Sequence, residues 1–197
     1  MPHGQVELEA GPVTLRSDVA RLLAGAGIVD VDVDEAVADE HVRGCAYARV
    51  VAVAVASGSR EGDRAVVAAI LRDPHEMGAK GAVVALVDGI AGKAVGPAEF
   101  WRWAQESLLP ELGGLRTGAY REFVRRRVDD WLFRLSLEER HVPTALELAG
   151  VTDWMQRLLA EGATSPAVLG LLAESGSTRK IRNIAGNRRG GGGRGTG

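Results

Sequence analysis

Three proline residues, each directly after a residue suited to a helix start, constrain the fold of this 197-residue chain most strongly. They occur in the pairs Asp73-Pro74, Gly96-Pro97 and Ser165-Pro166. Proline is favoured at the first position of a helix, where its missing N–H group would have no partner within the helix, and a preceding Asp or Ser caps the free amides. We therefore predict that a helix begins at each pair.

Apolar residues at helical spacing predict further helices over residues 14–24, 34–57 and 64–72. A long helix is expected after Gly113 and Gly114, where an apolar stripe runs from Tyr120 to Leu135. Alternating valines in "ARVVAVAVAS" are also typical of a strand, but the intervening alanines favour a helix. We predict an all-α protein of about seven or eight helices, either a compact helical bundle or a short α-solenoid.

Composition predicts one folded domain with loosely ordered ends. Hydrophobic residues make up 46% of the chain and charged residues 25%, which is typical of globular proteins. We expect a flexible N-terminus over residues 1–12 and a single helical domain over 13–186. The Gly- and Arg-rich residues 187–197 are expected to be disordered, because glycine loses the most backbone entropy on ordering and has no side chain to bury.

One segment, residues 63–92, resembles a unit of the HEAT-repeat family. In HEAT-type repeats an Asp-Pro pair starts the second helix and small residues at fixed offsets let the neighbouring helix approach closely. The matching residues are Asp73-Pro74, Met77, Gly81-Ala82, Ala85-Leu86 and Ile90. The resemblance implies a short HEAT-like stack of helices. It covers about one unit of roughly 35 residues, and the later helices depart from it by carrying Phe100, Trp101, Trp103 and Trp131.

Three Val-Val-Ala triplets are consistent either with an internal repeat or with chance. They are Val50-Val51-Ala52, Val66-Val67-Ala68 and Val83-Val84-Ala85, at intervals of 16 and 17 residues. Two such steps approach the period of a helical-repeat unit. A chain rich in Ala and Val also produces such triplets by composition alone, and both interpretations remain open at this point.

The candidate metal-binding patterns in the sequence are each incomplete. Asp30, Asp32 and Asp34 match the first, third and fifth positions of an EF-hand loop, but Glu35 replaces the required Gly and His41 replaces the bidentate Glu. His41 and Cys45 lie four residues apart on a predicted helix and supply two zinc ligands where a site needs more. We predict no metal, no cofactor and no enzymatic centre.

Cys45 is the sole cysteine of the chain, so an intramolecular disulfide is excluded. Its neighbours Gly44, Ala46 and Tyr47 favour a buried packing role. The N-terminal residues lack a basic region followed by an apolar stretch, and no window is apolar enough to cross a bilayer. We expect a cytoplasmic protein without membrane contact.

Basic residues concentrate near the C-terminus. The net charge is −2, yet residues 178–197 hold six of the 24 basic residues and no acid, leaving 18 basic against 26 acidic residues elsewhere. Such a segment can bind a polyanion or lie against the acidic body of its own chain. For nucleic-acid contact over residues 179–194, the candidates are Arg179, Lys180, Arg182, Arg188 and Arg189.

Residues 144–162 resemble the helix-turn-helix of bacterial regulators around the turn Ala149-Gly150-Val151-Thr152. The resemblance implies a recognition helix with Thr152, Trp154, Gln156 and Arg157 as candidate base-reading residues. Gln156 departs from the pattern, because those motifs bury a branched apolar residue there. An ordinary helical hairpin is the favoured interpretation.

Aromatic residues supply the candidates for a protein partner. Phe100 and Trp101, like Trp131 and Phe133, are too close in sequence to share one helix face, so one of each pair is a candidate for exposure. We select Trp101, Phe133 and Trp154. A non-catalytic protein-interaction module is the predicted function, and a nucleic-acid-binding regulator is the alternative; the sequence specifies no oligomeric state.

Overall fold

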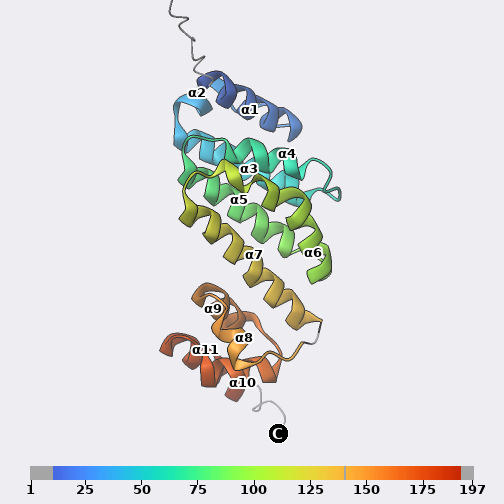
Figure 1. Ribbon diagram of the computed structural model, residues 1–197, viewed down its shortest axis with the longest axis vertical. Coiled ribbons are helices and arrows are strands. Elements are labelled where there is room, and N and C mark those ends of the chain that lie inside the picture. The colour runs from blue at the N-terminus through green and yellow to red at the C-terminus, as the bar shows by residue number, and fades with distance from the viewer. Residues whose placement is uncertain (1–10, 140, 192–197) are drawn as a thin grey trace, which may run out of the picture. The chain divides into compact units, whose positions relative to one another are not determined.

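The computed structural model describes residues 11–139 and 141–191 and contains helices but no strand in those residues (Figure 1). The all-α class is therefore confirmed. Eleven α-helices occur in this part of the chain, where the sequence predicts seven or eight. The additional helices are short ones such as α2 (Val33–Ala38) and α8 (Ala145–Ala149), which are too brief to show a periodic apolar pattern.

The chain is organised as two compact units, whereas the sequence predicts a single domain over residues 13–186. Of the described residues, unit 1 comprises 11–92 and 103–124, and unit 2 comprises 93–102, 125–139 and 141–191. Each unit combines two separate stretches of the chain, so local composition does not reveal this division.

Unit 1 contains five consecutive helices and two short irregular ones. They are α1 (Gly11–Gly25), α2, α3 (Glu40–Ala56), α4 (Asp63–Leu71), α5 (Glu76–Ala91), a π-helical turn at Ala104–Leu108 and a 3-10 helix at Leu109–Gly114. The predicted helix over 34–57 is interrupted at Asp39, whose extended backbone ends α2. Its carboxylate caps α3 by accepting hydrogen bonds from the backbone amides of His41 and Val42.

A buried ion pair connects three elements of unit 1. Arg43 Nε lies 2.6 Å from Asp73 Oδ2, and the two side chains are 7% and 2% exposed. Arg43 also donates to the carbonyls of Ala36 and Val37 at the end of α2, and Tyr47 donates its hydroxyl proton to Asp73 at 2.8 Å. Burial raises the pKa of Tyr47, which keeps its hydroxyl a donor.

Asp73 also decides where α5 begins. Its carboxylate accepts a hydrogen bond from the amide of His75, and α5 starts at Glu76 rather than at Pro74 as predicted. Helices α3 and α5 then approach closely at Gly89, where an added Cβ would lie 2.4 Å from Cγ2 of Val55. Two small residues of the HEAT resemblance, Gly81 and Ala85, are exposed, so the close approach occurs elsewhere on α5.

Unit 2 is built from the later helices. They are α6 (Pro97–Trp103) up to Arg102, the part of α7 (Gly118–Glu138) from Arg125 onward, α8, α9 (Asp153–Gly162), α10 (Pro166–Ser175) and α11 (Arg179–Gly191). Helix α10 begins at Pro166 with Ser165 as its cap, as the sequence predicts. The buried core of unit 2 includes Val128, Leu148, Met155, Leu172 and Ile181.

The predicted disordered tail begins at residue 187, but residues 187–191 continue α11. Two arginines hold this end of the helix: Arg188 donates to the carbonyl of Ala160, and Arg189 lies 3.5 Å from Glu174. Residues 192–197 of the predicted tail, and residues 1–10 of the predicted N-terminus, lie outside the described residues; residues 11 and 12 belong to α1.

Substitution of Gly89 by alanine should destabilise the protein because the new methyl group would overlap with Val55, whose branched side chain has little rotational freedom within a helix. We expect Gly89→Ala to lower the free energy of unfolding by about 1–3 kcal/mol. In the matched variant Gly81→Ala, the new Cβ has no atom within 4 Å, and helix propensity should raise stability by up to about 1 kcal/mol. Urea denaturation measures the free energy of unfolding of both variants. Equal changes in the two variants would contradict the close packing of α3 against α5.

Candidate partner-binding surfaces

A groove of about 370 Å³ lies among three helices of unit 1, and its volume falls within the range of ligand-binding clefts. We call it the α1–α3–α4 groove (Figure 1 labels the three helices). Its lining residues are Arg21, Leu22, Gly25, Ala26, Val50, Val53, Ala54, Ser57, Ser59, Glu61, Gly62, Asp63, Ala65, Val66 and Ala69. Most of these side chains are aliphatic or small, so the groove favours an apolar occupant.

The spacing of the lining residues shows how two helices form the walls. Helix α3 and its end contribute residues 50, 53, 54 and 57, and α4 with its N-cap contributes residues 62, 65, 66 and 69. Both sets follow the i, i+3, i+4, i+7 pattern of one helix face. The groove is therefore bounded by two stripes of small residues along adjacent helices.

The two ends of the groove carry opposite charge. At one end the buried Asp18 pairs with both Arg21, at 3.3 Å, and Arg72, at 2.7 Å, which leaves an excess of positive charge. Arg72 directly follows α4, so this end lies near the C-terminus of that helix. At the other end, the exposed Glu61 precedes the N-terminus of α4.

Asp63 is the buried carboxylate in the groove wall. Its Oδ2 accepts a hydrogen bond from Trp103 Nε1 at 2.9 Å and lies 3.3 Å from Arg60 Nη1. Burial raises the pKa of Asp63, and the bonds to Trp103 and Arg60 only partly offset that effect. Asp63 thus fixes the first turn of α4 against the segment that carries Trp103.

Gly62, directly before α4, has a positive φ of 103°, a conformation that strongly favours glycine. The preceding loop is held by Arg60, which donates to the backbone carbonyls of Ala54 and Ser57 at the end of α3. These bonds set the separation between the two small-residue stripes.

The three predicted partner-binding aromatics differ in exposure. Trp101 and Trp154 are each 39% exposed, whereas Phe133 is half-buried. Trp154 makes an edge-to-face contact with Trp131, with ring centroids 6.2 Å apart, and the guanidinium carbon of Arg127 lies 3.4 Å from the centroid of its ring. One face of Trp154 is therefore covered by a cation within unit 2.

The helix-turn-helix segment forms two helices, α8 and α9, but its predicted base-reading residues make contacts within unit 2. Gln156 is 2% exposed; its amide nitrogen donates to the carbonyls of Leu148 and Val151, and its oxygen accepts from the amide of Ser177. Thr152 donates its hydroxyl proton to the buried Asp130 at 2.5 Å. Burial raises the pKa of that carboxyl.

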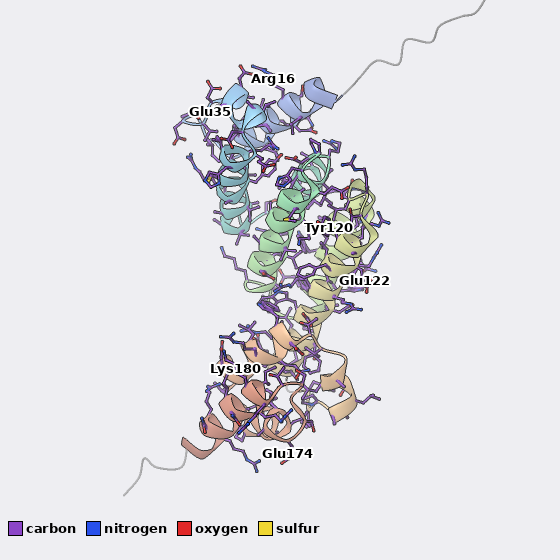
Figure 2. All side chains as sticks on the ribbon, turned by 90° about the vertical axis from the view of Figure 1, so that its left-hand side faces the viewer. Arg16, Glu35, Tyr120, Glu122, Glu174 and Lys180 are labelled. Atoms are coloured by element: carbon purple, nitrogen blue, oxygen red, sulfur yellow. The ribbon has the colours of Figure 1, made fainter. Side chains whose placement is uncertain are left out.

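The basic residues of the C-terminal segment fall on α11. Arg182 donates to the carbonyl of Gly176 and Arg188 to that of Ala160, so both satisfy carbonyl groups at the ends of neighbouring helices. Arg189 is paired with Glu174. Arg179 and Lys180 are exposed (Figure 2 labels Lys180). Three of the five candidate bases therefore make contacts within unit 2.

Acidic and sulfur-containing residues singled out by the sequence have structural positions. Asp32 caps α2, Asp30 pairs with Arg49, and Asp34 pairs with Arg16 on α1 (Figure 2 labels Arg16). Over residues 11–139 and 141–191, no group of three or more His, Cys, Asp or Glu residues could hold a metal ion. The predicted burial of Cys45 is wrong, because α3 exposes this residue.

No family model, curated protein or solved structure matches this chain. In the part of the chain that the structure describes, every helix is too short or too polar to cross a membrane.

Sequence reasoning missed the groove, although a signal for it is present. Small residues recur at helical spacing in 50–57 and again in 62–69, directly on either side of a Gly- and Ser-containing loop. Val50 and Val66 open two of the three related triplets. Tertiary packing decides whether two such stripes face a common space or face each other.

The pH dependence of stability should report the burial of Asp63. Because the pKa of Asp63 is raised on folding, its contribution to stability is complete below its unfolded value of about 3.9 and is lost as the pH rises through the folded value. Asp63→Asn keeps an oxygen for Trp103 and removes the charge. Wild type should therefore lose stability relative to this variant as the pH rises above about 4. Urea denaturation from acid to neutral pH measures this change, and a constant difference between the two proteins would contradict it.

Proposed function

We propose that this chain is a non-catalytic protein-interaction module that binds its partner in the α1–α3–α4 groove. The observation that carries the proposal is the groove itself, about 370 Å³ in volume and lined mainly by aliphatic and small side chains. Apolar clefts bordered by charged residues are typical of binding sites, because burial of apolar surface supplies affinity while the polar rim supplies specificity.

The charges around the groove support binding rather than chemistry. Asp18 and Asp63 are held in ion pairs with arginines that position α1 and α4. Acid–base catalysis requires a titratable group that can reach a substrate proton. Both carboxylates instead serve the packing of the walls. A cytoplasmic location fits this proposal, since the exposed thiol of Cys45 is compatible with a reducing compartment.

A photo-crosslinking experiment tests the proposed function. With a photoreactive benzoylphenylalanine at position 53, which is exposed in the groove, illumination in the native host should produce a discrete adduct with another protein. The same group at position 52, also exposed on α3 but outside the groove, should not produce it. Ala65→Phe, which fills the groove from α4, should abolish the adduct. The proposal fails if no protein adduct forms or if position 52 gives the same one.

The alternative is nucleic-acid binding by α11, and the exposure of Arg179 and Lys180 is the observation that favours it. Phosphate contacts by such residues weaken steeply as salt rises. Under our proposal, electrophoretic mobility shifts with mixed DNA and RNA at low and moderate salt should show no binding that depends on these side chains. A shift at low salt that is lost at moderate salt and with Arg179→Ala, Lys180→Ala would establish the alternative.

A further inference from the structure

The walls of the α1–α3–α4 groove match the surface of another helix. Two adjacent helices bury the ridge of a third when their facing residues are small enough to leave an indentation. Here the α4 wall consists of Gly62, Ala65, Val66 and Ala69, and the α3 wall of Val50, Val53, Ala54 and Ser57. Because no side chain of these two walls is larger than valine, large aliphatic side chains complement them best.

The length of the groove limits the occupant to about two helical turns of contact. Residues 62 to 69 of α4 span roughly 10 Å at 1.5 Å per residue. A helix crossing that distance presents apolar side chains at positions i, i+3, i+4 and i+7. An extended peptide would instead expose unpaired backbone groups against aliphatic walls, which is unfavourable.

The charges at the groove ends select among such helices. Asp18 is shared between Arg21 and Arg72, so the end near the C-terminus of α4 has one positive charge in excess. At the opposite end Arg60 pairs with Asp63, and the exposed Glu61 adds a negative charge. Complementary charge on a partner would fix its register in the groove.

We infer that the α1–α3–α4 groove receives an amphipathic α-helix of a protein partner. The helix places large aliphatic side chains against α3 and α4, an acidic residue beside Arg21 and a basic residue beside Glu61. This inference rests on the proposed function and specifies the chemistry of the partner.

Synthetic helical peptides serve as probes for the full-length protein. One peptide carries leucines at i, i+3, i+4 and i+7 with Glu at one end and Lys at the other; a second has Glu at both ends. Fluorescence anisotropy should show that wild type prefers the Glu/Lys peptide by about twofold to fivefold, the range expected for one exposed ion pair.

Two protein variants locate the binding and test its charge dependence. Ala65→Phe fills the groove and should weaken binding at least about tenfold, whereas Ala52→Phe on the outer side of α3 should leave it unchanged. Glu61→Lys makes both groove ends basic, so the preference should invert in favour of the peptide with two Glu residues. If the single substitution Glu61→Lys inverts the peptide preference, that preference arises from charge complementarity. A loss of folding stability would instead weaken the binding of both peptides.

Several results would overturn the inference. They are absence of peptide binding, binding insensitive to Ala65→Phe, and a preference that Glu61→Lys does not invert. Displacement of the probe by a peptide of residues 1–10 at similar concentration would also overturn it, since the occupant would then be a segment of this chain. Should the inference fail while the position-53 adduct still forms, the groove binds a protein of other chemistry; loss of that adduct refutes the proposed function itself.

Discussion

The ion pair between Arg43 and Asp73 is the interaction on which unit 1 depends. It joins the end of α2, the first half of α3 and the start of α5: Arg43 donates to Asp73 and to the carbonyls of α2, and Asp73 also accepts from Tyr47 and from the amide of His75. Removing one member of such a buried pair leaves an uncompensated charge, at a cost of about 3–5 kcal/mol. The position of α3 relative to α5, and hence the wall that α3 contributes to the groove, follows from this contact.

In unit 1, buried polar residues fix the ends of helices and small apolar residues determine how closely the helices pack. Buried carboxylates at Asp18, Asp63 and Asp73 each bond to arginine and fix the ends of helices. The segments between those ends carry Ala, Val and Gly, which allow helices to approach at Gly89 and leave a space where α1, α3 and α4 diverge. The binding surface therefore results from how the ends of the helices are held.

The sequence was sufficient for the helical class and for the helix starts at Pro97 and Pro166, because capping and proline geometry act locally. It was insufficient for Asp73, which looks like a helix cap but forms a pair with Arg43, thirty residues away. Cys45 was misplaced for a similar reason: on an Ala- and Val-rich helix, composition does not show which face is covered. The groove is a product of long-range packing, so the small residues at helical spacing in 50–57 and 62–69 did not by themselves predict it.

Gln156 has a consequence for how this architecture can diverge. Its amide group donates twice, to the carbonyls of Leu148 in α8 and Val151 just after it, and accepts once from the amide of Ser177, just before α11. A glutamate would offer no donor to the two carbonyls, and leucine would remove the side-chain bonds to both carbonyls and to the amide of Ser177. Distant descendants of this chain should therefore retain an amide at this place after the surrounding helices have changed beyond recognition, which makes it a marker of common ancestry.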